Sequence, residues 1–203
     1  MNSFSNIILA SQSPRRKDIL KRHGIEPVLM PADIDETLPP GIGPRDAVMY
    51  LALKKALTCL DAVRAEGGAS EGSLIIAADT VVYKDEILGK PKDRADAERI
   101  LRKLSGTSHL VATGVALVPA GRMEKRVFCE TTEVWIRSLT DDQLNAYLDT
   151  DEPYDKAGAY AIQGTFCRYV DHIDGDYENV IGLPYLRLRE EMDALAEELE
   201  SEK

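Results

Sequence analysis

The sequence predicts an α/β protein with a mixed, twisted β-sheet that is flanked by helices and opens on a cleft. Residues 7–20 run from a β-branched apolar strand through a short polar loop into a helix, an order typical of α/β folds. Residues 73–83 form a nearly continuous apolar run, which is typical of a strand buried on both faces. Hairpin patterns over residues 81–88 and 109–137 add antiparallel pairs, so the sheet should be mixed.

Composition places the chain among ordinary globular proteins. Its 203 residues fit one large domain or two small lobes, and 44% hydrophobic with 30% charged residues can form a sizeable core. We expect one domain over residues 1–199 and a charged tail over residues 200–203. No apolar run approaches the ~18 residues of a membrane span, and the N-terminus lacks the pattern of a signal peptide.

Net charge and cysteine content restrict the partners and the compartment. A net charge of −10 argues against a surface for nucleic acid or anionic membranes. An anionic ligand would therefore need a local cationic pocket and a divalent metal. Cys59, Cys129 and Cys167 are odd in number and scattered, which favours free thiols in a reducing cytoplasm over a disulfide framework or a zinc site.

The loop between the first strand and the first helix has the features of an anion site. Ser13 is a good N-cap, Pro14 suits the first helical position, and Gly24 is a plausible C-terminal stop. Arg15 and Arg16 lie in the first turn, where the helix dipole already presents positive charge. Free N–H groups and guanidinium groups together bind phosphate well. The alternative is a surface helix whose arginines are only solvated.

A second group of candidates lies between residues 26 and 72. A short strand over residues 26–30 leads to an acidic turn, in which Glu36 is the best candidate for holding a metal or positioning water; a solvated turn is the alternative. Apolar residues at helical spacing predict a helix over residues 45–65, before a Gly- and Ser-rich linker at 67–72. Lys55 on that helix either extends its ammonium group to solvent along an apolar stem or reaches a phosphate in a cleft.

One carboxylate, Asp79, interrupts the apolar strand over residues 73–83. Burying an ionised Asp without a partner is expensive, so we place Asp79 at a cleft, paired with a cation, a metal or a water. An Asp that caps a neighbouring turn is the alternative. The hairpin continues to residues 87–91, where Lys90 precedes a helix start and could direct its amine toward Asp79.

Alternating and helical apolar patterns predict the remaining elements. They are a helix over residues 93–104, strands over 109–119 and 122–137, and a helix over 141–149 behind the N-cap Thr140. Two further strands, over residues 167–173 and 177–181, are predicted before a terminal helix that starts after Gly182-Leu183-Pro184. The apolar side of that helix would consist of Leu186, Leu188, Met192, Leu195 and Leu199.

The stretch over residues 152–164 is rich in small residues and has two glycines, which indicates that its backbone closely approaches another group. We expect this stretch, the loop over residues 11–16 and Asp79 to converge on the cleft. The residues alone therefore predict a phosphate-handling pocket with a carboxylate base and lysines.

The motifs of this chain, taken together, resemble the Maf family of nucleoside triphosphate pyrophosphatases. They follow the order of the family and cover about residues 6–190. They are Ser11-x-Ser-Pro-Arg-Arg16, Ala78-Asp79-Thr80, Gly89-Lys90-Pro91, Ser105-Gly106, Thr113-Gly114-Val115, Asp155-Lys156-Ala157-Gly158-Ala159-Tyr160, Ile162-Gln163-Gly164 and Gly182-Leu183-Pro184. The Lys-Ala-Gly-Ala-Tyr and Gln-Gly segments resemble the branch that acts on dTTP and UTP. Thr165-Phe166-Cys167 departs from the Leu-Gly that usually follows in the family.

The resemblance implies two lobes around a central cleft, an architecture shared with inosine triphosphatases, and hydrolysis between the α and β phosphates. Asp79 would orient and deprotonate the attacking water. Asp79 and Glu36 would hold a divalent cation, Mg²⁺ or Mn²⁺. Arg16, Lys55 and Lys90 would hold the triphosphate, and Lys90 and Glu36 are grouped with Asp79 as catalytic residues.

The resemblance also implies the residues that recognise the substrate. Ser11 and Ser13 belong to the substrate-binding loop, and Arg15, Thr80 and Gln163 would set the base preference. A glutamine amide can accept a hydrogen bond from N3–H of thymine or uracil and donate one to a ring carbonyl. A glutamate, which only accepts, would suit guanine instead.

Two other functions remain open at this point. The chain could be a nucleotide-binding regulator of cell division without turnover, since the family is named for a septum-inhibition effect. It could also be a pyrophosphatase for modified nucleotides, which would differ only in the details of the pocket. A homodimer is implied by the resemblance alone.

Overall fold

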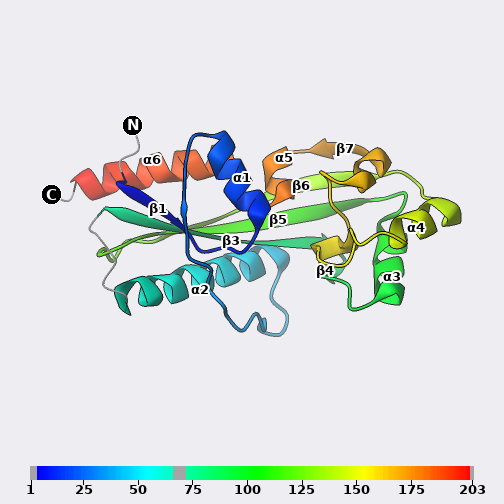
Figure 1. Cartoon of the computed structure of the whole chain (residues 1–203), viewed down its shortest axis with the longest axis horizontal. Helices are drawn as coiled ribbons and strands as arrows, with labels where there is room; N and C mark the ends of the chain where they lie inside the picture. The colour runs from blue at the N-terminus through cyan, green and yellow to red at the C-terminus, as the bar shows by residue number, and fades with distance from the viewer. Residues whose placement is uncertain (1–3, 66–71, 202–203) are drawn as a thin grey trace. The chain divides into compact units, whose positions relative to one another are not determined.

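The computed structural model describes residues 4–65 and 72–201 of the chain (Figure 1). The chain divides into two compact units. Unit 1 comprises Met1–Asp79, Thr113–Glu130 and Gly182–Lys203, and unit 2 comprises Thr80–Ala112 and Thr131–Ile181. Most of the predicted linker, residues 67–71, lies outside the described residues. None of the described helices is long and apolar enough to cross a membrane.

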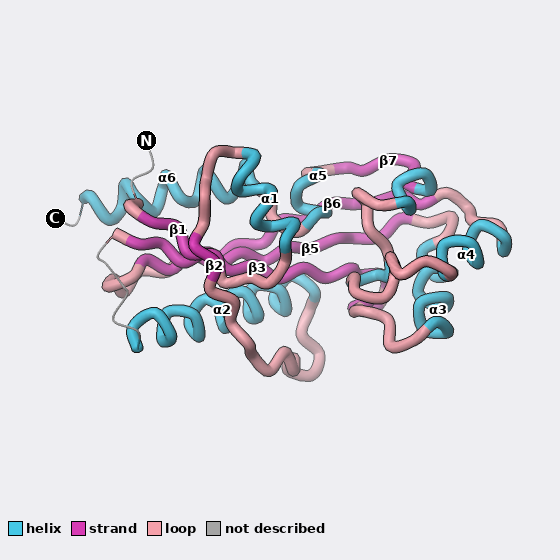
Figure 2. The backbone as a smooth tube through the Cα atoms, in the orientation of Figure 1, coloured by secondary structure: helices cyan, strands magenta, loops and turns pink. Residues whose placement is uncertain are grey.

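The described strands form one seven-stranded mixed sheet with the order β2-β1-β3-β5-β6-β7, in which β4 pairs with β3 off this path (Figure 2). β1 runs parallel to β2 and β3, whereas β3–β4 and β6–β7 are antiparallel. The predicted mixed sheet flanked by helices is therefore confirmed. The strands are β1 Asn6–Leu9, β2 Val28–Leu29, β3 Ser73–Lys84, β4 Glu86–Leu88, β5 Ser108–Pro119, β6 Arg126–Ile136 and β7 Val170–Asp174.

The described residues of unit 1 form three helices: α1 Pro14–Arg22, α2 Pro44–Ala65 and α6 Tyr185–Ser201. Within this unit, α2 lies on one side of the strands and α6 on the other (Figure 1). Small buried side chains on α2, including Ala52 and Ala56, pack with Ile75 and Ala116 of the strands. A methyl group added at Gly114 on β5 would lie 2.3 Å from the carbonyl carbon of Val48. Glycine is therefore required here, because α2 lies directly against the backbone of β5.

Unit 2 contains the remaining helices: α3 Arg94–Leu104, α4 Asp141–Leu148, α5 Tyr177–Ile181 and the 3₁₀ helices η1 Ala157–Ala159 and η2 Thr165–Tyr169. The predicted N-cap of α4 is confirmed, since Thr140 and Gln143 form a complete capping box. Phe166 is fully buried and its ring packs against the rings of Tyr147 and Tyr160. The segment that begins at Thr165 is therefore fixed in the core of this unit.

The structure departs from the sequence predictions in three places at the C-terminal end. Residues 177–181 form α5 and not a strand: the Asp176 carboxylate accepts a hydrogen bond from the Glu178 amide at 2.7 Å, an N-terminal cap for the helix. Leu186 is 72% exposed and so does not belong to the apolar side of α6. That helix also includes Glu200 and Ser201, which we assigned to the tail, while residues 202–203 lie outside the described part.

A buried histidine in unit 2 predicts acid sensitivity. His109 is 3% exposed, and its Nε2 lies 2.8 Å from the Tyr160 hydroxyl. Among the described residues, its Nδ1 has no hydrogen-bond partner. Burial, reinforced by the Lys84 ammonium group, lowers the pKa of His109 from 6.5 to about 3.

Because only the unfolded chain binds a proton at His109 between about pH 6.5 and pH 3, acidification favours unfolding. This histidine should lower the free energy of unfolding by up to about 1.4 kcal/mol per pH unit in that range. We expect His109→Gln to have a shallower loss of stability between pH 6.5 and 5, measured by urea unfolding. Equal slopes for the variant and the parent protein would contradict this origin of the acid sensitivity.

Candidate active site

Three predicted site residues meet in unit 1 around one ammonium group. Lys55 Nζ lies 2.6 Å from Asp79 Oδ1 and 2.7 Å from Glu36 Oε1. The side chains of Lys55 and Asp79 are only 14% and 13% exposed, whereas that of Glu36 is 60% exposed. The buried carboxylate on β3 therefore has the cationic partner that its burial requires. The alternative that Lys55 simply extends into solvent is wrong.

The tight packing of α2 on the sheet positions Lys55. Gly114 allows this close approach near Val48, and Lys55 lies three residues after the buried Ala52 on the same helix, so the two share one side. Its ammonium group therefore reaches the carboxylate of the neighbouring strand.

The acidic turn before α2 presents Glu36 because its neighbours make local bonds. Asp35 Oδ1 accepts hydrogen bonds from the amide (2.9 Å) and hydroxyl (2.6 Å) of Thr37, which is a typical Asx turn. The pKa of Asp35 is lowered by these bonds from Thr37. Lys54 Nζ donates to the Asp35 carbonyl oxygen at 2.5 Å. Asp35 thus shapes the turn, and Glu36 contacts Lys55.

Arg16 is held by two oxygen atoms in unit 1. Its Nε donates to the carbonyl oxygen of Gly182 (2.8 Å), and one terminal nitrogen donates to Ser11 Oγ (3.1 Å). Burial lowers the pKa of the Arg16 guanidinium, and the Asp79 carboxylate opposes this effect. The sequence predicts Gly182-Leu183-Pro184 as the start of the terminal helix, and no local pattern indicates its contact with Arg16. Gly182 has a φ of +124°, a conformation that favours glycine and here accompanies a carbonyl bonded to Arg16.

The start of α1, where the sequence predicts an anion site, has two features that bear on this prediction. Ser13 is the N-cap residue, but its side chain makes no capping hydrogen bond, and its amide donates to Ser11 Oγ at 3.2 Å. The first turn has no acidic residue and carries Arg15, which is half-buried. The amide groups of this turn are therefore not occupied by the Ser13 side chain.

The other predicted site residues, Thr80, Lys90 and Gln163, belong to unit 2. Thr80 is half-buried on β3, and Lys90 and Gln163 are exposed. Gln163 lies in a turn that closes with a hydrogen bond from the Gly164 amide to the Ala161 carbonyl oxygen (3.1 Å). Each group of site residues is defined within its own unit, so the convergence of the two groups stays a prediction.

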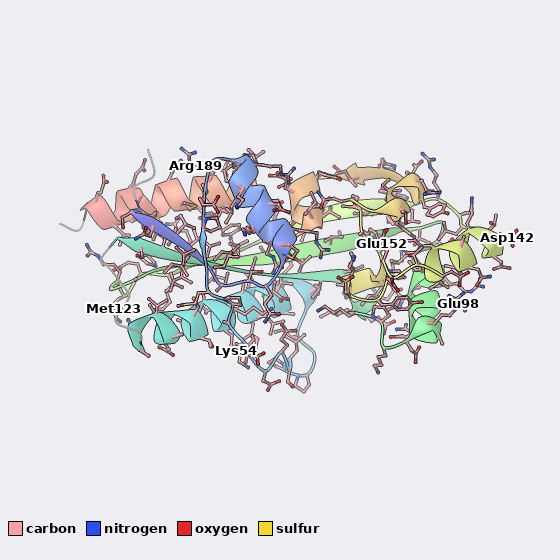
Figure 3. All side chains as sticks on the ribbon, in the orientation of Figure 1. Lys54, Glu98, Met123, Asp142, Glu152 and Arg189 are labelled. Atoms are coloured by element: carbon pink, nitrogen blue, oxygen red, sulfur yellow. The ribbon has the colours of Figure 1, made fainter. Side chains whose placement is uncertain are left out.

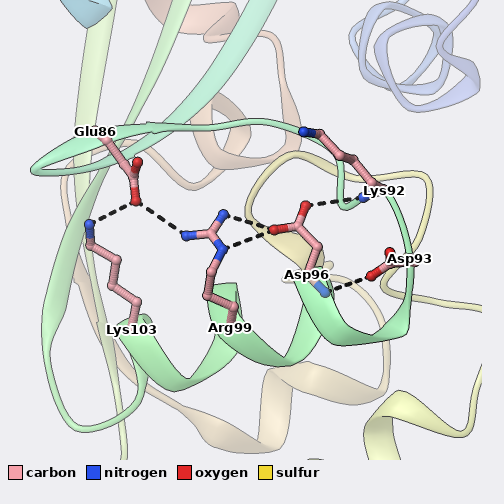
Figure 4. A network of polar contacts seen from close by, with 6 residues as sticks. All are labelled: Glu86, Lys92, Asp93, Asp96, Arg99 and Lys103. Atoms are coloured by element: carbon pink, nitrogen blue, oxygen red, sulfur yellow. Dashed lines mark hydrogen bonds and ion pairs between the residues drawn. The ribbon is translucent and has the colours of Figure 1, made fainter.

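A polar network fixes both ends of the segment that carries Lys90 (Figure 4). Glu86 accepts hydrogen bonds from Arg99 (3.3 Å) and Lys103 (3.0 Å) on α3. At the other end, the amide of Lys92 donates to Asp96 at 3.1 Å. Although such exposed pairs contribute little to stability, they define the course of the chain on either side of Lys90.

The two glycines of the stretch over residues 152–164 confirm the predicted close backbone approaches. A methyl group at Gly158 would lie 2.7 Å from the Val82 side chain on β3, and one at Gly164 would lie 2.1 Å from the Glu152 carboxylate. The Gly158 amide also donates to the carbonyl oxygen of Gly89 at 3.1 Å. The segment next to Lys90 is therefore attached to this stretch.

Within the described residues, no group of three or more His, Cys, Asp or Glu side chains could hold a metal ion. Asp79 and Glu36, however, both contact the same ammonium group, so their carboxylates can jointly hold a cation. Mg²⁺ is commonly bound by one or two carboxylates together with substrate phosphates and water. The donor set fits such a metal, provided that the substrate completes its coordination.

Fold and site together define an α/β protein in which the cationic side chains of Lys55 and Arg16 lie near the buried carboxylate of Asp79. The Maf-like protein family matches residues 6–195, and the chain belongs to this family. A dTTP/UTP pyrophosphatase of Acetivibrio thermocellus is 46% identical over 182 residues, 90% of this chain and 91% of that protein. A dTTP/UTP pyrophosphatase of Desulfitobacterium hafniense is 47% identical over 194 residues, 95% of this chain and 86% of that protein.

The solved structure of the Staphylococcus aureus Ham1 protein has a TM-score of 0.45 and 15% identity, covering 98% of this chain and 100% of that chain. At that level the likeness carries no conclusion about this chain.

Proposed function

We propose that this protein is a nucleoside triphosphate pyrophosphatase that hydrolyses dTTP and UTP to the monophosphate and pyrophosphate. Two dTTP/UTP pyrophosphatases are 46% and 47% identical to this chain over 90% and 95% of its length. The observation that carries the proposal is the Lys55 ammonium group held between Asp79 and Glu36. A protein that only binds a polyphosphate has no need of a buried carboxylate at that place.

In the proposed reaction, Asp79 accepts a proton from the water that attacks the α phosphorus. The α–β bond breaks, and pyrophosphate leaves. Lys55 and Arg16 contact the triphosphate, with Lys90 and the first-turn amides of α1 as further donors. Asp79 and Glu36 would hold a divalent cation, Mg²⁺ or Mn²⁺, which would neutralise phosphate charge.

Base selection is assigned to Arg15, Thr80 and Gln163. The Gln163 amide is exposed at the tip of its turn, so both its oxygen and its nitrogen can meet a pyrimidine. An amide complements the N3–H donor and the ring carbonyl acceptor of thymine and uracil. Ser11 acts by holding Arg16 and the Ser13 amide in place.

We also propose that the protein acts in the cytoplasm, on a nucleotide and not on nucleic acid or membranes. All three of its cysteines are unpaired thiols, as is usual in a reducing compartment. A homodimer remains a proposal that derives from the family resemblance.

The test is release of pyrophosphate from a panel of nucleoside triphosphates with Mg²⁺ or Mn²⁺, with products separated by ion exchange. We expect UMP and dTMP with pyrophosphate, and little product from purine nucleotides. Nucleotide binding without any product would favour the regulator of cell division. Preference for a modified pyrimidine would identify a different substrate for the same reaction.

A further inference from the structure

One carboxylate in unit 2, that of Glu152, accepts hydrogen bonds from the residues that follow shortly after Gln163. Its Oε2 accepts hydrogen bonds from the amide and the hydroxyl of Thr165, both at 2.9 Å. Its Oε1 accepts from the Tyr147 hydroxyl (3.0 Å) and more weakly from the Phe166 amide (3.4 Å). Figure 3 labels this side chain. A single carboxylate therefore has four donors, three of them from two consecutive residues.

The residue between Gln163 and these donors packs on the same carboxylate. A methyl group at Gly164 would lie 2.1 Å from Glu152 Oε1, so no larger residue fits there without moving Glu152. The Gly164 amide also closes the turn that contains Gln163. The position of this turn therefore depends on where the carboxylate lies.

Glu152 is itself attached to the core of unit 2. Its Tyr147 partner is buried on α4, and the Tyr147 ring packs against Phe166 with centroids 4.8 Å apart. The amide of Glu152 donates to Thr150 Oγ1 at 3.3 Å. Burial acts to raise the pKa of Glu152, but the hydrogen bonds from Thr165, Phe166 and Tyr147 together outweigh this effect, so the pKa is lowered. The group is ionised at neutral pH and accepts all four bonds.

We infer that Glu152 is the residue that positions Gln163 for base discrimination: its carboxylate anchors the turn that presents the Gln163 amide to the pyrimidine. This role rests on the proposed function. Thr165, where the chain departs from the usual family pattern, supplies two of the four donors. In this chain a threonine therefore strengthens the anchor of the turn.

The variant Glu152→Gln keeps the size of the side chain but replaces one acceptor oxygen with an NH₂ donor. That donor must face either the Thr165 amide or the Phe166 amide, which are donors too. We expect the ratio of kcat/KM for UTP over GTP to fall by about 10-fold, because a misplaced polar group discriminates poorly between bases. The kcat for UTP should change less than this ratio.

The matched control is Glu133→Gln, a half-buried glutamate on β6 of the same unit, which should leave the ratio unchanged. Thr165→Val removes the hydroxyl bond to Glu152 Oε2 and keeps the amide bond. It should therefore lower the UTP-to-GTP ratio of kcat/KM by less than Glu152→Gln does. If Glu152→Gln does not fold, Thr165→Val alone tests the positioning role of Glu152. A purely structural role would lower activity on all nucleotides in equal proportion. An unchanged ratio in the folded variants overturns this role alone, whereas a parent protein without turnover overturns the proposed function as well.

Discussion

Replacing Asp79 by Asn should abolish turnover and leave nucleotide binding intact. The change removes the proton acceptor while keeping the shape of the side chain, and general-base catalysis typically contributes about 10²–10⁴-fold to the rate. Lys55 would still contact Glu36, since that contact at 2.7 Å does not involve Asp79. The cationic site for the phosphates should therefore persist.

The measurement is kcat for UTP together with UTP affinity by calorimetry. Asp61→Asn, an exposed position on α2, is the matched control and should behave like the parent protein. If Asp79→Asn retained kcat within about threefold, the expected general-base contribution would be absent, and Asp79 would be a partner for Lys55 and nothing more.

Replacing Gln163 by Glu should shift the base preference from pyrimidine toward guanine nucleotides. A carboxylate only accepts hydrogen bonds, so it would lose the donor that faces a ring carbonyl of uracil and would suit the two donors of guanine. A buried polar group left unpaired costs about 1–3 kcal/mol, which corresponds to roughly a 10-fold change in preference or more.

The relevant measurement is kcat/KM for UTP, dTTP and GTP under identical metal concentrations. Gln143→Glu introduces the same charge at the third position of α4, where a glutamate preserves the capping box. That control should keep the parent preference. Equal relative kcat/KM values in Gln163→Glu and the parent protein would remove Gln163 from base selection.

Local patterns were sufficient for the elements whose signals are local. The strand, loop and helix around Ser13 and the capped helix behind Thr140 depend on neighbours in sequence. The helix α5 did not follow this rule, since its β-branched residues favour a strand. The position of α5 depends on Asn179. Its side-chain amide donates to the Val111 carbonyl oxygen and to Thr132 Oγ1, each at 3.0 Å, and these two acceptors lie on strands that are distant in sequence.

The same distinction applies to the candidate site. Burying Asp79 in an apolar strand requires a cation, so a partner could be predicted, but its identity as Lys55 depends on how α2 packs on the sheet. The contact between Arg16 and Gly182 joins residues 166 positions apart, and the bonds of Glu152 to Thr165 depend on the course of the whole turn. No local pattern shows such contacts.

The most direct test of the proposed reaction is hydrolysis of UTP in water enriched in ¹⁸O, with the products analysed by mass spectrometry. Attack of water on the α phosphorus places one ¹⁸O atom in UMP and leaves the pyrophosphate unlabelled, and this is the result that we predict. Label in pyrophosphate, or formation of UDP and phosphate, would mean that water attacks the β or γ phosphorus. Either result would contradict the assignment of Asp79 as the base for attack on the α phosphorus.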